Sequence, residues 1–302
     1  MLRWLPIVLL AAHATAESAT RTLAARYDAP ACRSAMRRML DPTGAFAGSR
    51  WAMLSPNWVQ QDGALYNGTI LYVRNQKVGS EMIMSSARHS PLGPQKPLDY
   101  AGRFPRGDVP SLSYATPAAL PADFFVFSIV GEPGTVAAKA YLEISRRRTR
   151  PQKLEPTVEA DGGLGAYRGI PCDAAGATRR FKTFLQELAN GTDLGREAFH
   201  AWPQALKLAV VAPRGGRRFD ALGRLERVGE DLAEVRAAVG AASPPGHDRH
   251  VLGRHHHTTA GLACARPDLG DGDVRRLLCD LYAADYACFG YAGCEAPRLG
   301  AP

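Results

Sequence analysis

Runs of apolar residues alternate along the chain with amphipathic stretches, and the two patterns predict strands followed by helices. The β-branched and aromatic run at 69–74, TILYVR, predicts a strand, and a glycine-containing turn leads from it into a predicted helix at 81–90. A second apolar run at 124–130, FFVFSIV, predicts a buried strand that is followed by a helix over 135–147. The repeated order of strand, turn and helix predicts an α/β fold with a mainly parallel central sheet flanked by helices.

Further helices and loops occupy the rest of the chain, and nothing in the pattern divides it into separate domains. Helices are expected within 17–50, 177–191, 220–240 and 271–291, a strand at 205–211 (ALKLAVV), and loops rich in proline and glycine at 90–122 and 149–178. The sequence shows no internal repeat and no clear linker. We therefore expect a single domain.

The first residues have the pattern of a cleavable signal peptide. Arg3 precedes an apolar run, and Ala14-Thr15-Ala16 supplies a cleavage site of small residues. The run is shorter than the roughly 20 residues that span a bilayer. We expect a signal peptide at 1–16 and a folded domain at 17–302, with an uncleaved membrane anchor as the alternative.

Two glycosylation signals and the cysteine content agree with export. The sequons are Asn67-Gly68-Thr69 and Asn190-Gly191-Thr192. The cysteines are Cys32, Cys172, Cys264, Cys279, Cys288 and Cys294. An even number in an exported chain favours disulfides, whose pairing stays open, and the spacings lack the paired C-x-x-C pattern of zinc sites. The expected location is the secretory pathway, in the Golgi lumen or membrane or outside the cell, and we expect no bound metal.

Composition and charge limit the classes of partner. Hydrophobic residues make up 46% of the chain, which is typical of a globular protein and not of a disordered one. The formal net charge of +8 suits an anionic partner such as a nucleotide, an acidic glycan, nucleic acid or anionic lipid. Export and the lack of an aromatic-interleaved RNA motif argue against nucleic acid. A membrane is a partner only if the N-terminal segment is an anchor.

The turn after the first predicted strand has the residues of an anion-binding loop. It reads Asn75-Gln76-Lys77-Val78-Gly79-Ser80 and joins the strand to a helix. A glycine there lets backbone N–H groups close around a phosphate, while Lys77 supplies positive charge and Ser80 a hydroxyl donor. Since the order of a Walker A loop is absent, a plain turn with a surface lysine is the alternative.

Five segments, in order along the chain, together resemble one enzyme family. They are VRNQKVGS from Val73, FFVFSIVGEPGTVAAKAYLEI from Phe124, HAWPQALKL from His200, FDALGRLERVGEDLAEV from Phe219 and LCDLYAADYACFGY from Leu278. They are similar to the phosphosulfate loop, the second strand and helix, the Pro-Gln segment, the acidic stretch and the closing helix of Golgi-type carbohydrate sulfotransferases. The resemblance covers most of 69–291. It implies a P-loop-like sulfotransferase fold and transfer of a sulfuryl group from 3′-phosphoadenosine 5′-phosphosulfate to a glycan hydroxyl.

The resemblance also implies roles for particular residues. Lys77 would lie on the oxygen that bridges sulfur and phosphorus. The 5′-phosphate would be held by the rest of the loop, at Val78, Gly79, Ser80 and Glu81. His200 is the expected general base that takes the proton of the acceptor hydroxyl, because its ordinary pKa suits that task. The alternative for His200 is a packed side chain that orients a loop.

Four positions depart from the family pattern. Gln76 stands in place of the proline before the loop lysine, and Gly131 and Val136 stand in place of the two arginines of the motif V-R-D-P-x-x-R. Lys139 replaces a serine that, with the first of these arginines, grips the 3′-phosphate in the family. Because Lys139 keeps a donor, we expect it to bind that phosphate. The alternative to an active enzyme is a catalytically degenerate, secreted binding protein on the same fold.

Overall fold

The computed structural model describes most of the elements that the sequence pattern predicts. The described residues are 18–40, 63–66, 69–75, 77, 78, 83, 95–98, 123–148, 170, 173–190, 200–209, 216–241 and 265–294. The helices are α1 (Ala19–Tyr27), α2 (Pro30–Leu40), α4 (Pro133–Arg148), α5 (Ala174–Ala189), α6 (Gln204–Leu208), the 3₁₀ helix η7 (Leu225–Arg227), α7 (Val228–Ala238), α9 (Gly272–Leu281) and α10 (Ala283–Phe289). The signal peptide expected at 1–16 lies outside the described residues, as does the helix expected at 81–90 except for Ile83.

Five strands form one sheet in the order β3-β1-β2-β4-β5. Their bounds are β1 (Gly63–Tyr66), β2 (Ile70–Val73), β3 (Gln95–Leu98), β4 (Phe125–Val130) and β5 (Ala221–Arg224). β2, β4 and β5 are parallel, which confirms an α/β fold with a parallel sheet of three strands flanked by helices. β1 pairs antiparallel with both β2 and β3, so the expectation of a mainly parallel sheet is confirmed only in part. The connection between β1 and β2 is too short for the crossover that a parallel pair needs.

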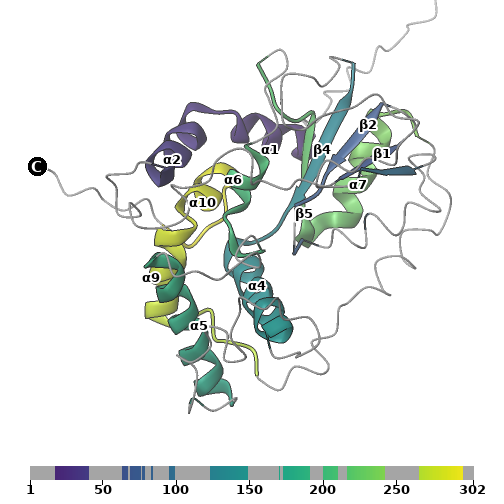
Figure 1. Ribbon diagram of the computed structural model, residues 1–302. Helices are drawn as coiled ribbons and strands as arrows, with labels where there is room; N and C mark the ends of the chain where they lie inside the picture. Colours follow the sequence, from purple (N-terminus) through teal and green to yellow (C-terminus); the bar gives the residue numbers. More distant parts are fainter. Residues whose placement is uncertain are drawn as a thin grey trace, which may run out of the picture.

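The sheet separates two hydrophobic cores. Val126 and Val130 of β4 point into the larger core, and Phe127 and Ile129 point into the smaller one, as the period of two along a strand requires. The larger core is completed by α1, α2, α4, α5, α6, α9 and α10, and the smaller chiefly by α7 (Figure 1). Burial of one large apolar side chain contributes about 1.5–3 kcal/mol to stability. The two-sided burial of β4 explains why its sequence is a continuous apolar run.

Three details of the predicted pattern are wrong or incomplete. The strand expected at 205–211 is wrong where the structure describes it, because residues 204–208 form the helix α6. β5 is a strand that the pattern did not predict, although the helix expected within 220–240 is present as α7. The single helix expected at the C-terminal end is divided at Tyr282 into α9 and α10.

Two disulfides tie the C-terminal helices to other parts of the chain. Cys32 of α2 is bonded to Cys288 of α10, and Cys279 of α9 is bonded to Cys294. These bonds confirm the expectation of disulfides and agree with an oxidising environment. Within the described residues, no helix is both long enough and apolar enough to cross a membrane.

Candidate functional site

The carboxyl ends of the parallel strands β2, β4 and β5 lie at one edge of the sheet, and the segments that follow them form the candidate site. Lys77 and Val78 follow β2, Gly131 and Glu132 follow β4, and η7 follows β5. Open α/β sheets bind ligands in the crevice outside this edge. The loop lysine that the sequence singled out therefore lies at the edge where such folds bind ligands.

Lys77 has a strained backbone and a charged neighbour. Its backbone φ angle is 67°, and among the described residues other than glycine Lys77 alone has a positive φ. This conformation costs about 1 kcal/mol, and such strain is concentrated at functional sites. The Lys77 side chain is only 20% exposed, and its Nζ lies 3.7 Å from Oε2 of Glu143 on α4. Its expected partners in the loop, Gly79, Ser80 and Glu81, lie outside the described residues.

Close packing around Gly131 fixes the start of α4 against the loop. A Cβ added at Gly131 would lie 3.0 Å from Cγ2 of Val136 and 3.2 Å from Cγ1 of Val78. Both valines are buried, so an arginine at position 131 would require them to move. The structure thus gives a steric reason for glycine at position 131, where the sequence resemblance alone would lead one to expect an arginine.

A buried glutamine joins the strand ends. Oε1 of Gln204 accepts hydrogen bonds from Nδ2 of Asn75 at 2.8 Å and from the backbone N of Gly131 at 2.9 Å. Nε2 of Gln204 donates to the backbone O of Gly131 at 2.8 Å. Asn75 Nδ2 also donates to the carbonyl of Ile129. Because Gln204 and Asn75 are fully buried, these bonds hold the ends of β2 and β4 in a fixed relation without competition from water.

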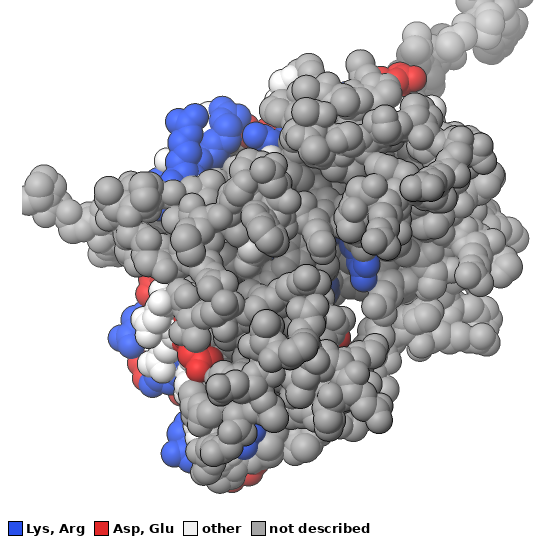
Figure 2. Space-filling model, in the orientation of Figure 1, with Lys and Arg blue, Asp and Glu red and all other residues white. Residues whose placement is uncertain are grey.

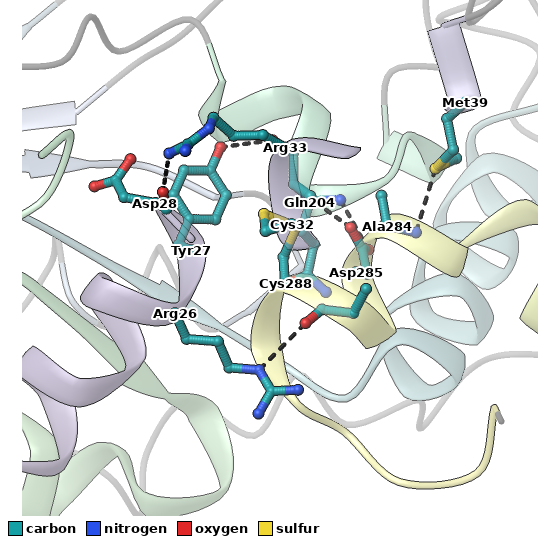
Figure 3. The surroundings of a disulfide bond; sticks show 12 residues. Arg26, Tyr27, Asp28, Cys32, Arg33, Met39, Gln204, Ala284, Asp285 and Cys288 are labelled. Atoms are coloured by element: carbon teal, nitrogen blue, oxygen red, sulfur yellow. Dashed lines mark hydrogen bonds between the residues drawn. A yellow bond between two sulfur atoms is a disulfide. The ribbon is translucent and has the colours of Figure 1, made fainter. Parts of the chain in front are cut away.

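The same glutamine begins α6, and Asp285 of α10 caps that helix. Oδ2 of Asp285 accepts from the N–H of Gln204 at 2.9 Å, and Oδ1 accepts from the N–H of Ala205 at 2.7 Å. Figure 3 shows Asp285 directed at Gln204, close to the disulfide between Cys32 and Cys288. Burial raises the pKa of Asp285 to about 6, and the two backbone N–H groups oppose that rise.

A buried lysine lies beneath the loop. Lys207 of α6 is 1% exposed, and its Nζ donates to the carbonyl oxygen of His200 at 3.3 Å. Burial lowers the pKa of Lys207 to about 7, Asp285 raises it, and the positive charge of Lys77 lowers it further. The structure therefore joins Lys207 to the backbone of His200 by a hydrogen bond and couples it electrostatically to Lys77.

Lys139, the expected ligand of a 3′-phosphate, lies away from this buried network. It is exposed on α4, and its charged neighbours are Glu226 and Arg266. Glu226 belongs to a separate group of hydrogen bonds at the ends of β4 and β5. Its Oε1 accepts from the N–H of Glu132 at 2.8 Å, and its Oε2 accepts from the hydroxyl of Tyr291 at 3.0 Å.

Replacement of Gln204 by leucine is expected to lower the free energy of unfolding by about 3 kcal/mol. The change leaves the buried N–H and C=O of Gly131 without the side-chain partners they now have, and each orphaned group costs about 1–3 kcal/mol. Urea unfolding followed by circular dichroism measures the loss. Gln186→Leu, at an exposed position of α5, is the matched control and should change stability by less than about 0.5 kcal/mol. Equal stability of the two variants would contradict the role of Gln204.

Several residues of the site were not singled out by the sequence. Lys207 stands between two leucines in a run that predicts a buried strand, and nothing in that pattern marks its ammonium group as part of a site. Asn75 and Asp285 are each polar residues beside apolar runs, and their burial depends on contacts with segments far away in the chain. The Pro-Gln pair within HAWPQALKL was the available signal for Gln204.

Comparison with protein-family models, with curated proteins and with solved structures finds no match to this chain.

Proposed function

We propose that this chain is a sulfotransferase that takes a sulfuryl group from 3′-phosphoadenosine 5′-phosphosulfate and transfers it to a hydroxyl of a glycan. The observation that carries the proposal is Lys77, a strained cationic residue at the carboxyl end of a parallel strand, with Lys207 close by. A cationic side chain at this edge of the sheet favours an anionic ligand. The order of the five segments that resemble Golgi-type sulfotransferases supports a phosphosulfate as that ligand.

The proposed reaction needs little covalent chemistry from the protein. The acceptor oxygen forms a bond to sulfur, the bond between sulfur and the bridging oxygen breaks, and adenosine 3′,5′-bisphosphate leaves with the bonding electrons. Negative charge therefore grows on the bridging oxygen, where Lys77 would stabilise it. The proton of the acceptor hydroxyl passes to a base, for which His200 is the proposal. Positioning of the two substrates supplies the remaining acceleration.

An anion-binding protein without transfer activity is the second candidate, and one observation favours it. Val78 and Val136 enclose Gly131, so no side chain at this position reaches a 3′-phosphate. Lys139 would then have to hold that phosphate from an exposed position. A chain that binds the nucleotide but transfers no sulfuryl group would fit this arrangement.

Calorimetric titration with adenosine 3′,5′-bisphosphate tests the shared first step. We expect Lys77→Ala to weaken binding roughly tenfold to a hundredfold, which is about 1.4–2.7 kcal/mol, because a charge-assisted contact to the 5′-phosphate is lost. Lys182→Ala is the matched control, since Lys182 forms an ion pair with Asp273 between α5 and α9. Adenosine 5′-monophosphate is titrated alongside, and the difference between the two binding free energies gives the contribution of the 3′-phosphate.

The outcomes separate the candidates. Binding that weakens in Lys77→Ala, together with transfer of labelled sulfate from the donor to a glycan panel, supports the enzyme. The same binding without transfer to any acceptor supports the binding protein. A folded chain that does not bind the bisphosphate contradicts both.

A further inference from the structure

The two N-terminal helices carry a concentration of arginine that the proposed reaction does not use. Residues 18–40 contain five arginines and one acidic residue, Asp28. Four of the arginines are exposed, and they are Arg21, Arg26, Arg37 and Arg38. Figure 2 shows blue side chains gathered over the position of α1 and α2 in Figure 1. We call these four side chains the arginine face.

The arginine face is not neutralised by carboxylates in the described part of the chain. Arg26 donates to the backbone carbonyl of Ala287 and Arg38 to the hydroxyl of Ser34, so both interact with neutral oxygens. Asp28 is engaged by a residue outside the face, because its carboxylate accepts from the backbone and the guanidinium of Arg218. The positive charge of the arginine face is therefore available to an external anion.

Several other cations of the described chain are paired with carboxylates. Arg227 forms ion pairs with Glu230 and Asp231, and Lys182 forms one with Asp273. At these places exposed charge is interspersed with the opposite sign, as is usual for a soluble surface. The arginine face departs from that arrangement.

The helices that carry the face are held rigidly. Cys32 is bonded to Cys288, and the Tyr27 ring stacks on Phe289 with centroids 5.8 Å apart and packs edge-on against Phe219. The Tyr27 hydroxyl also donates to the carbonyl of Ala205 at 2.7 Å. Figure 3 shows Tyr27 beside the disulfide between Cys32 and Cys288. A surface fixed in this way loses little conformational entropy of the backbone when a ligand binds.

We propose that the arginine face binds an acidic polysaccharide, through the sulfate or carboxylate groups along its chain. Guanidinium groups match the planar fork of a carboxylate and the oxygens of a sulfate better than ammonium groups do. Arg21 and Arg26 lie on α1 and Arg37 and Arg38 lie on α2, so the face offers charges on two helices and not at a single point. The binding surface needs neither Lys77 nor the transfer of a sulfuryl group, and the inference is independent of the proposed function.

The composition of the face favours a polysaccharide over a lipid surface. The other exposed residues of these helices are small or polar, and they are Thr22, Ala25, Pro30, Ala31 and Ser34. A helix that lies in a membrane interface presents large apolar side chains to the acyl region. The disulfides indicate an oxidising compartment, where polyanionic glycans and not nucleic acids are the expected partners.

Retention of the full mature chain on immobilised heparin, a sulfated polysaccharide, tests the inference. The variant Arg21→Gln/Arg37→Gln/Arg38→Gln removes three charges and leaves Arg26, which contacts Ala287. The matched control, Arg179→Gln/Arg275→Gln/Arg276→Gln, removes three exposed charges from α5 and α9. We expect the first variant to elute at lower salt and to bind heparin roughly tenfold to a hundredfold more weakly at physiological ionic strength, and the control to bind like the parent chain.

Two further measurements keep the test decisive. Arg21→Lys/Arg37→Lys/Arg38→Lys keeps the charge and should retain most of the binding if the triple glutamine variant lost it through charge and not through misfolding. Vesicles with 30% or so of anionic lipid, assayed by flotation, are expected not to retain the protein. Equal loss in the two glutamine variants, no binding of the parent chain to heparin, or binding to vesicles that depends on the same arginines would each overturn the proposal.

Discussion

Replacement of Cys32 and Cys288 by serine is expected to lower the free energy of unfolding by about 5 kcal/mol, which approaches the whole stability of many domains. The bond joins residues separated by 256 positions, and a cross-link that closes so long a loop removes much conformational entropy from the unfolded chain. In the folded state it also fastens α2 to α10 within the larger core. Urea unfolding of the parent and the double variant under non-reducing conditions measures the difference.

The second disulfide provides the control for this experiment. Cys279 and Cys294 are separated by 15 positions, so their replacement by serine should cost only about 3 kcal/mol. If the two double variants were equally stable, loop length would not be the source of the stabilisation, and the contribution of the Cys32–Cys288 bond would have to come from local contacts of α2.

The largest pH effect is expected from Lys207. Burial lowers its pKa to about 7 in the folded chain, whereas an unfolded lysine has a pKa of about 10.4. Between these values the unfolded chain holds a proton that the folded chain has released, so the free energy of unfolding should rise with pH. Since one pKa unit corresponds to 1.36 kcal/mol, the rise from Lys207 between pH 7 and 10 is about 4 kcal/mol. Urea unfolding at a series of pH values measures it.

Comparison of two variants isolates this contribution from other titrating groups. Lys207→Met should abolish the rise, and Lys182→Met, at a half-exposed position paired with Asp273, should leave it in place. A rise that persists unchanged in Lys207→Met would contradict the assignment.

Asp285 acts in the opposite sense at lower pH, because burial raises its pKa to about 6 and stability falls as pH increases from about 4 to 6. The combined contribution of Asp285 and Lys207 to the free energy of unfolding is therefore smallest between pH 6 and 7.

The elements that the sequence predicted correctly have side chains that determine the local structure. The run at 124–130 contains β-branched and aromatic residues that suit a strand buried on both faces, and it forms β4. The stretch at 177–191 places Phe181, Leu185 and Leu188 on one helical face, and all three are buried in α5. For such segments the pattern of burial can be read from neighbours in the chain.

The elements that were missed depend on residues far away in the chain. α6 is a helix of 5 residues, too short to be stable alone, and the Asp285 carboxylate caps its first N–H groups from a distance of 81 positions in sequence. β5 contains a glycine and an arginine in a strand of four residues, and it becomes a strand because β4 offers it a parallel partner. Tertiary contacts decide both cases, and no local pattern encodes them.

The residues of the candidate site also fall into those that the local sequence identifies and those that depend on distant contacts. Lys77 could be identified because a lysine and a glycine stand between a predicted strand and a predicted helix. Lys207 and the hydrogen bonds of Gln204 could not, since they depend on how α6 packs under the strand ends. Sequence reasoning therefore identified the lysine at the carboxyl edge of the sheet and missed the buried groups that hold its surroundings in place.

The bond between Cys32 and Cys288 can form only late in the synthesis of the chain. At about 5–20 residues per second, synthesis of the 256 residues that follow Cys32, up to and including Cys288, takes roughly 13–50 s. Throughout that time Cys32 carries a thiol whose native partner has not been made. The N-terminal helices therefore complete their place in the larger core only when the C-terminal helices arrive, and a product that stops before Cys288 retains a reactive thiol by which thiol–disulfide exchange can capture and retain it.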